Sequence, residues 1–314
     1  MLTPALGFAR IALRSSTCLV LALALGSLLV QPARGQFPGA GAEEKKGGSF
    51  TFKEAKINYW RFEPKNAKGT LPAIVVLHGI EGLDAFANSG NLPKDIADNY
   101  KLICKMVAEK GYAVRFVHYM QCEPIKANQV PEFQEQIKAN LLAPPGKVDP
   151  KIKQLFKTWM SCVKGAVDDL RDAENPANGN IDRDRVGVIG LSMGGFVAMS
   201  LAVTEPKFDP QAIVVVCGGL PEELHEKVSK LPPILMICGT KDDVVPFSHA
   251  RKVRNSLEDK DCSVTLVPFP CYHMFLDGKV DSKPKPKLQL NMALQAQNWA
   301  EVFLSQHVQK APRK

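Results

Sequence analysis

Three side chains that together can turn a hydroxyl into a nucleophile occur along this chain in the order Ser192, Asp242, His273. A serine hydroxyl reacts poorly at neutral pH unless a histidine accepts its proton, and that histidine needs a carboxylate to hold its ring. The serine lies in the segment GLSMGG, residues 190–195, which has the form G-x-S-x-G. We therefore expect Ser192 to attack a carbonyl carbon, with His273 as the base and Asp242 as the orienting acid.

The residues around Ser192 favour this interpretation. An apolar run, Val186–Ile189, leads into the motif, and a helix is predicted to begin directly after it. A nucleophile on a sharp strand-to-helix turn has a strained backbone, and glycines two residues away on either side avoid clashes with the crossing strand and helix. The start of that helix would supply free N–H groups and a positive dipole end that suit an oxyanion. The alternative is a glycine-rich turn with an incidental serine.

Two carboxylates compete for the role of the acid. We favour Asp242, because it stands three residues after Gly239 on the turn that leaves an apolar run. Asp243 could instead cap a helix or face solvent. His273 comes after this acid loop, follows the last predicted strand and precedes the last predicted helix.

The other histidines fit the role of the base less well. His225, His249 and His307 are expected on the surface, whereas His118 follows a strand end and could line the pocket. The imidazole of His78 comes too early in the chain order for the base.

An oxyanion intermediate needs two backbone N–H donors. One should be the N–H of Met193, the residue after the nucleophile. The other should come from the segment HGIEG, residues 78–82, where Ile80 is our candidate. His78 is expected to brace this loop, and the sequence leaves open whether Glu81 faces the pocket or solvent.

The elements that must position these residues alternate between strands and helices. Short apolar runs typical of strands buried on both faces follow an extended segment at 51–62, and they occupy 73–77, 112–117, 185–190, 212–217, 234–238 and 263–269. Amphipathic helices are predicted over 93–109, 153–170, 193–203 and 247–257, with a terminal helix on which Leu288, Met292, Trp299 and Phe303 share a face. This alternation predicts a parallel sheet with helices on both faces and the three reactive residues at its carboxyl edge.

Residues 119–150 interrupt the alternation and are rich in Pro, Gln, Asn and Lys. Ligands bind beyond the carboxyl ends of strands in such sheets, so this insertion lies where a small cap would cover the site. A structureless excursion is the alternative.

Together these motifs resemble the α/β hydrolases and, within them, the dienelactone hydrolase family. The resemblance rests on the HGIEG loop, on DRVGVIGLSMGG at 184–195, on GTKDDVVP at 239–246 and on His273, and it spans most of residues 70–275. It implies an α/β-hydrolase fold with a mostly parallel eight-stranded sheet. It also implies hydrolysis of a small-molecule carboxylic ester or lactone through an acyl-enzyme, without a cofactor.

The chain departs from that family at two positions. Dienelactone hydrolases proper have a cysteine where this chain has Ser192, and a glutamate where it has Gly79. A serine carboxylesterase therefore fits better than an enzyme specific for dienelactones. The alternatives are an exported serine peptidase of the prolyl-oligopeptidase type and a non-catalytic binding module on a hydrolase scaffold. No metal-ligand spacing and no glycine-rich phosphate or dinucleotide motif occurs.

The first 35 residues are expected to direct export. An apolar stretch, Cys18–Val30, follows two arginines; it is shorter than the about 20 residues that span a membrane, but it suits a signal peptide cleaved before Gln36. An uncleaved anchor is the alternative. We expect a periplasmic or extracellular protein, with a disordered lead-in at 36–48, the hydrolase domain at 49–309 and a basic tail at 310–314.

The chain has 314 residues, a net charge of +8 and 45% hydrophobic residues, as ordinary globular proteins have. Its lysines show no aromatic-interleaved basic stripe, so nucleic-acid binding is not expected, nor is stable membrane insertion of the mature chain. The sequence leaves the oligomeric state open.

Of 8 cysteines, one falls in the signal segment. Cys217 and Cys238 are expected as buried thiols and Cys122 with Cys162 as a disulfide, because export permits such bonds.

Overall fold

The computed structural model describes residues 41–310, except 84–91, 93, 124, 127–128, 281, 283 and 285. The predicted signal peptide at 1–35 and the tail after Lys310 lie outside the described residues.

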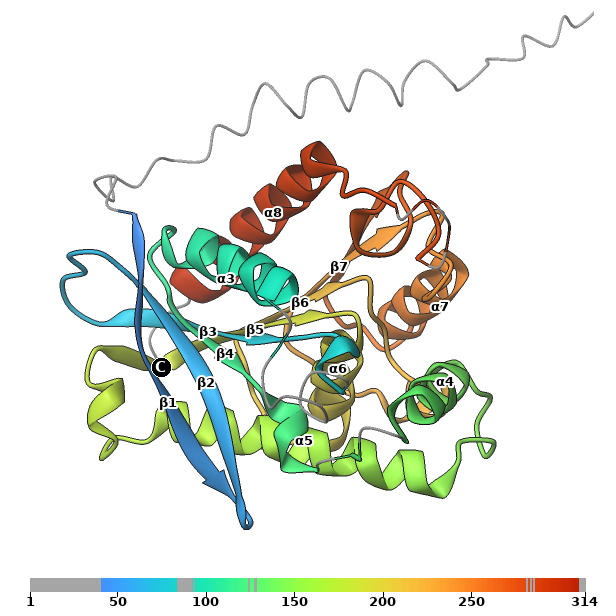
Figure 1. Cartoon of the computed structure of the whole chain (residues 1–314), viewed down its shortest axis with the longest axis horizontal. Coiled ribbons are helices and arrows are strands. Elements are labelled where there is room, and N and C mark those ends of the chain that lie inside the picture. Colours follow the sequence, from blue (N-terminus) through green and yellow to red (C-terminus); the bar gives the residue numbers. More distant parts are fainter. Residues whose placement is uncertain are drawn as a thin grey trace, which may run out of the picture. The chain divides into compact units, whose positions relative to one another are not determined.

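A sheet of eight strands, in the order β1-β2-β4-β3-β5-β6-β7-β8, runs through the described part of the chain (Figure 1). The strands are β1 (Ala42–Phe52), β2 (Ala55–Pro64), β3 (Leu71–Leu77), β4 (Ala113–Val117), β5 (Ile181–Leu191), β6 (Ala212–Val216), β7 (Ile234–Gly239) and β8 (Val264–Phe269). β1 and β2 form an antiparallel hairpin, and β2 pairs antiparallel with β4. The other five pairs are parallel. The predicted mostly parallel eight-stranded sheet is thus confirmed.

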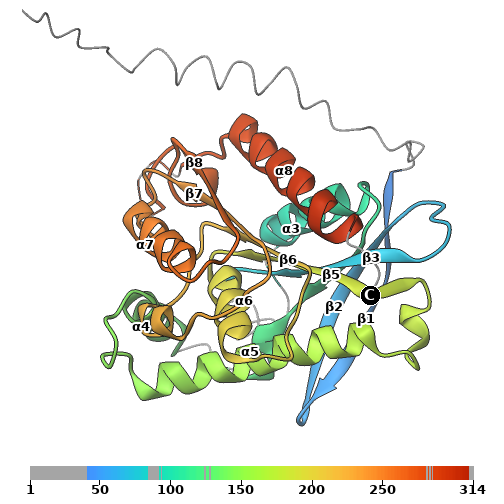
Figure 2. The ribbon, with the colours of Figure 1, turned by 180° about the vertical axis from the view of Figure 1, so that it is seen from behind.

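Helices cover both faces of this sheet, as the opposite views of Figures 1 and 2 show. The helices α3 (Lys94–Ala108) and α8 (Leu290–Leu304) pack on one face. The other face carries α4 (Val130–Leu141), α5 (Pro150–Arg171), α6 (Met193–Thr204) and α7 (Phe247–Glu258). Short helical turns are η1 (Tyr119–Cys122), η3 (Pro176–Asn178), η4 (Glu222–Lys227), η5 (His273–Phe275) and η6 (Ser305–Gln309).

The central strands show why short apolar runs build this sheet. All residues of β3 are buried. Alternate side chains point to opposite faces, so Val75 packs into the layer that holds α5 and α6, and Val76 packs into the layer that holds α3 and α8. A strand covered on both sides has no polar face, which is why its sequence lacks an apolar–polar alternation.

The predicted disordered lead-in at 36–48 is wrong from Ala42 onward, because β1 begins there. This edge strand is held by backbone pairing with β2, and the aromatic side chain of Phe50 enters the core. Most of its other side chains are exposed or half-buried, so glycine and charge are compatible with a strand here. Because this part of β1 is rich in glycine and charged residues, its composition alone suggested disorder.

The insertion at 119–150 contains η1 and the helix α4. The alternative of a structureless excursion is therefore wrong for the part of the insertion that the structure describes. Val130 and Ile137 of α4 are buried against the layer that holds α5. The helix α5 begins at Pro150, with the Asp149 side chain accepting a hydrogen bond from the N–H of Lys151.

All seven cysteines among the described residues are free thiols, which corrects the expected disulfide between Cys122 and Cys162. The two residues do lie side by side, with a hydrogen bond between their thiols. This bond and burial raise the pKa of Cys162 far above its usual value. Each sulfur is thus satisfied in the reduced form.

The terminal helix α8 buries Phe303 and Leu304, as an amphipathic helix should. Leu288 lies before this helix and Trp299 is 49% exposed, so the predicted apolar face is only partly correct. No helix of the described residues is long and apolar enough to cross a membrane.

Candidate active site

Ser192 lies on the sharp turn between β5 and α6. Its φ of 48° is in the left-handed region, which costs energy for a residue with a side chain. A Cβ on Gly190 would lie 2.5 Å from the backbone of Gly194, and a Cβ on Gly194 would lie 2.5 Å from the carbonyl oxygen of Leu77. The G-x-S-x-G pattern is therefore a steric requirement of this turn.

His273 links Ser192 to Asp242. Its Nε2 lies 3.0 Å from Ser192 Oγ, and its Nδ1 lies 2.8 Å from Asp242 Oδ2. The His273 side chain is 10% exposed and that of Asp242 is fully buried, so water competes little for these hydrogen bonds. The structure thus brings together the three side chains that the sequence analysis singled out.

Asp242 is held by its own loop. Its Oδ1 accepts hydrogen bonds from the N–H groups of Val244 and Val245, at 2.9 and 2.8 Å. This leaves Oδ2 for the histidine. The neighbouring Asp243 is exposed, which separates the two carboxylates that the sequence left in competition.

Backbone hydrogen bonds tie the acid loop to the histidine loop. The N–H of Thr240 donates to the carbonyl oxygen of Phe269 at 2.7 Å, and that of Lys241 donates to Cys271 at 3.0 Å. A Cβ on Gly239 would lie 2.5 Å from that same Cys271 oxygen, so the close approach requires glycine. The positions of the acid and the base are therefore fixed relative to each other.

Met193 and Ile80 line a small cavity of about 20 Å³ next to Ser192. Met193 is the first residue of α6, so its N–H has no acceptor within the helix. Ile80 lies in the turn after β3, where the N–H of Leu83 donates to its carbonyl oxygen at 3.0 Å. Both residues predicted to supply oxyanion donors thus line the same cavity as Ser192.

The loop after β3 is braced by the residues that precede and follow Ile80. His78 is buried, its Nδ1 lies 2.8 Å from the carbonyl oxygen of Gly79, and its ring stacks on Tyr119. The carboxylate of Glu81 accepts hydrogen bonds from the N–H of Gly79 and from the hydroxyl of Tyr100. Glu81 therefore holds the loop, which answers the question that the sequence left open.

The remaining wall of the cavity beside Ser192 comes from two other segments. Lys138, Leu141 and Leu142 lie at the end of α4 within the insertion, and Val244 and Val245 belong to the acid loop. The insertion thus contributes to the site, as a cap would. Its residues could not be assigned to the wall from the sequence, because no periodic signal fixes where α4 ends.

Cys217 is a neighbour of the site that the sequence analysis took for an ordinary buried thiol. Its φ is 49°, and its sulfur accepts a hydrogen bond from the N–H of Met274 at 3.4 Å. Ligand atoms of Cys217, Asp242 and His273 all lie within 4.8 Å of one another. Burial, followed by the charge of Asp242, raises the pKa of Cys217 well above its usual value. The thiol thus stays protonated, and the Asp242–His273 hydrogen bond already pairs two of these three groups.

None of the other histidines lines the cavity beside Ser192. His118 is buried and packs edge-on against Trp60, and it is not part of the wall of the cavity beside Ser192. His249 is 4% exposed and stacks on Phe196, so the expected surface position is wrong. His225 is half-buried, and its Nδ1 lies 3.1 Å from Ser256 Oγ.

Comparison with solved structures places this fold among known hydrolases. A putative dienelactone hydrolase from Klebsiella pneumoniae superposes with a TM-score of 0.58 at 18% identity, over 84% of this chain and 98% of that one. An esterase from Pseudomonas putida gives 0.58 at 17% identity, over 92% and 88% of the two chains. A dienelactone hydrolase-like phosphotriesterase from a metagenomic library gives 0.60 at 14% identity, over 85% and 99%. At these identities the likeness establishes the fold alone.

A search of curated proteins gave no match. The sequence itself matches the profile of the dienelactone hydrolase family over residues 57–305, which includes every residue of the site described above. This chain is therefore a member of the dienelactone hydrolase family.

Proposed function

We propose that this protein is a serine hydrolase that cleaves carboxylic esters or lactones through an acyl-enzyme. The observation that carries this proposal is the chain of hydrogen bonds from Ser192 through His273 to Asp242. A neutral imidazole whose Nδ1–H donates to a carboxylate presents a free lone pair at Nε2, which is what a general base for a hydroxyl needs.

In the first half of the reaction, Ser192 Oγ attacks the carbonyl carbon while its proton passes to His273 Nε2. The carbonyl oxygen becomes an oxyanion and accepts hydrogen bonds from the N–H groups of Met193 and Ile80. The intermediate then collapses: the bond to the alcohol oxygen breaks, and the imidazolium gives its proton to that oxygen. Asp242 stabilises the imidazolium throughout.

In the second half, water replaces the alcohol. His273 Nε2 accepts a proton from water as its oxygen attacks the acyl carbon, and the same N–H groups hold the second oxyanion. The bond between Ser192 Oγ and the acyl carbon then breaks, and the serine oxygen takes the proton back from the histidine. A carboxylic acid leaves and the enzyme is restored.

Labelling with a fluorophosphonate probe tests the nucleophile. The wild-type protein should be labelled, and Ser192→Ala should lose all labelling because the reacting oxygen is gone. Ser229→Ala is a control, because this exposed serine lies outside the site. A wild-type protein that stays unlabelled would support the alternative of a non-catalytic binding module.

Substrate tests separate an esterase from a peptidase. We expect hydrolysis of p-nitrophenyl butyrate and none of prolyl or other peptide anilides. The reverse preference would support the peptidase alternative. One of the structural relatives is a promiscuous phosphotriesterase, so paraoxon is a useful third substrate.

We also propose that the protein is exported, as its N-terminal sequence suggests. Expression of the full chain in a bacterial host should yield most of the protein outside the cytoplasm. Replacement of Leu21 and Leu23 by aspartate should retain it inside, because a charged stretch no longer acts as a signal.

A further inference from the structure

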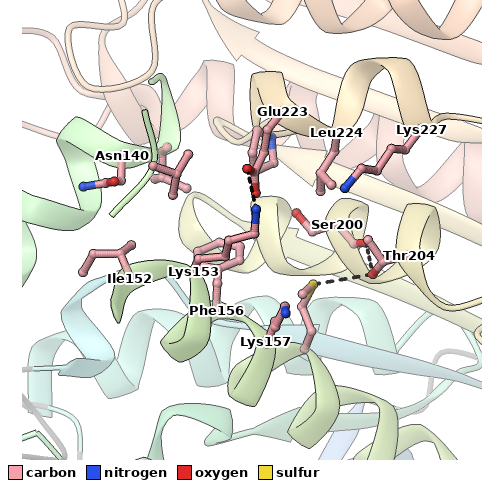
Figure 3. Close-up of a pocket in the computed structure, with 14 residues that line it drawn as sticks. Asn140, Ile152, Lys153, Phe156, Lys157, Ser200, Thr204, Glu223, Leu224 and Lys227 are labelled. Atoms are coloured by element: carbon pink, nitrogen blue, oxygen red, sulfur yellow. Dashed lines mark hydrogen bonds and ion pairs between the residues drawn. The ribbon is translucent and has the colours of Figure 1, made fainter. Parts of the chain in front are cut away.

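A second cavity lies beyond the one beside Ser192. It has a volume of about 100 Å³ and lies between α5, α6 and η4, with the end of α4 on one side (Figure 3). Its wall is mainly apolar and includes Ile152, Phe156, Met160 and Leu224. None of the proposed catalytic residues lines it.

The two cavities share Leu141 as a lining residue. They also follow each other along α6: Phe196 lines the first cavity, and Ser200 lines the second one turn later. An α-helix rises about 1.5 Å per residue, so Ser200 lies roughly 12 Å beyond Ser192 along this helix. The second cavity is therefore within reach of a chain attached to Ser192 Oγ.

Ser200 carries a polar group that the protein itself leaves unpaired. The residue is 1% exposed, and its hydroxyl has no hydrogen-bond partner among the described residues and less than 1 Å² of accessible surface, so a ligand oxygen reaches it only when the wall of the cavity shifts. Figure 3 shows the side chain directed toward the cavity. Burying a hydroxyl without a partner costs free energy, and an oxygen of a bound ligand would remove that cost.

The charges around the cavity leave a positive excess. Lys153 is paired with Glu223, with 2.8 Å between Nζ and Oε2, and this pair joins α5 to η4 (Figure 3). Lys157 and Lys227 also line the cavity, and neither forms an ion pair within the described part of the chain. Both are exposed at its rim, so a carboxylate near them would keep partial contact with water.

We propose that this cavity binds the far end of the substrate's acyl group, and that this group is an unbranched chain of about eight to ten carbons that ends in a carboxylate. The proposal rests on the ester hydrolysis proposed above. An extended chain advances about 1.2 Å per bond, so roughly ten bonds cover the distance from Ser192 to Ser200. The apolar wall suits the methylenes, and Ser200, Lys157 and Lys227 suit the carboxylate. Leu141 separates the two cavities and has to move aside when the chain enters.

Three p-nitrophenyl esters test the proposal: the butyrate, the decanoate and the monoester of decanedioic acid. We expect kcat/KM to be about tenfold higher for the decanedioate than for the decanoate, because a hydrogen bond or contact to a charged group is worth roughly that factor. Ser200→Ala and Lys227→Gln should each lower the ratio of decanedioate to butyrate hydrolysis by about fivefold to tenfold. Lys230→Gln is the matched control, because this exposed lysine does not line the cavity and should leave the ratio unchanged.

Binding gives a readout that does not depend on turnover. Decanedioate should bind to Ser192→Ala in calorimetry, and a second substitution, Ser200→Leu, should abolish that binding by filling the cavity. Circular dichroism melting of each variant shows that it is folded.

Equal rates with decanoate and decanedioate, or a ratio unaffected by Ser200→Ala and Lys227→Gln, would overturn the inference. Hydrolysis of the butyrate in that case would leave the proposed function standing, whereas loss of all ester hydrolysis would count against the function itself.

Discussion

Asp242 and Asp243 are adjacent in the chain, yet only Asp242 reaches the histidine. Asp242 is buried, and both of its carboxylate oxygens accept hydrogen bonds, whereas Asp243 is exposed. We predict that Asp242→Asn lowers kcat for p-nitrophenyl butyrate by about three to four orders of magnitude, because an amide no longer selects the reactive tautomer of His273. Asp243→Asn should stay within about twofold of the wild type, since its side chain contributes no such bond. Comparable losses in both variants would show that the wrong carboxylate has been assigned.

Buried histidines should make the protein sensitive to acid. Burial lowers the pKa of His249 to about 4, with the nearby His225 contributing, and it lowers the pKa of His118 to about 3. The unfolded chain takes up a proton at about pH 6.5, before the folded protein does, so stability is lost as the pH falls from about 6.5 to about 4. Each unit of pKa difference corresponds to about 1.4 kcal/mol, so His249 contributes up to about 3 kcal/mol to this loss.

Replacement of this histidine provides the test. Urea denaturation at pH 7.5 and pH 4.5 should show that His249→Gln loses about 2 kcal/mol less stability than the wild type between these two values. Glu222 and Lys252 also lie near His249, and both remain in the variant. An unchanged loss of stability would mean that other groups cause the sensitivity to acid.

At the scale of elements, the strands that carry the site were the easiest to predict. Runs such as 73–77 and 234–238 contain apolar residues at every position, and this leaves a strand buried on both faces as the natural interpretation. The glycines at 190 and 194 also indicated the strand–turn–helix geometry around Ser192, and the structure shows that side chains at these two positions would clash with the backbone. Strand order and the end of α4 were beyond the sequence, because both depend on contacts between segments far apart in the chain.

The extended segment predicted at 51–62 corresponds to β2, but the edge strand β1 was missed, for a different reason. Edge strands face solvent over much of their length, so their sequences need few apolar residues. Phe50 is the exception, being 8% exposed and packed against the core. We predict that Phe50→Ala lowers the free energy of unfolding by about 3 kcal/mol, as expected for truncation of a buried aromatic ring.

The exposed neighbour Thr51 provides the comparison for this prediction. Thr51→Ala should change the free energy of unfolding by less than about 0.5 kcal/mol, because it removes no buried contact. Both values come from urea denaturation at neutral pH. Similar small effects for the two variants would show that β1 adds little to the stability of the sheet.

At the scale of the whole molecule, residues from five separate segments make the site. The loop after β3, the insertion, the β5–α6 turn, the acid loop and the histidine loop all meet at the carboxyl edge of the parallel strands. Chain order and strand pattern were enough to predict the meeting of Ser192, Asp242 and His273. They could not predict the place of Cys217, because one apolar strand that ends in a cysteine looks like any other.

The first element of the described residues is β1, which starts at Ala42. Cleavage before Gln36 would leave this strand intact and reduce the net charge of +8 by the three arginines of the signal segment. We therefore predict that a chain beginning at Gln36 has the melting temperature and the esterase activity of the exported protein. A chain beginning at Lys53 should melt at least about 5 °C lower or aggregate, because it lacks the Phe50 contact and leaves the edge of β2 unpaired. Intact-mass measurement of the exported protein checks the cleavage site, and differential scanning calorimetry of the two truncated chains checks the role of β1. Equal melting temperatures for the two chains would show that the sheet is complete without its first strand.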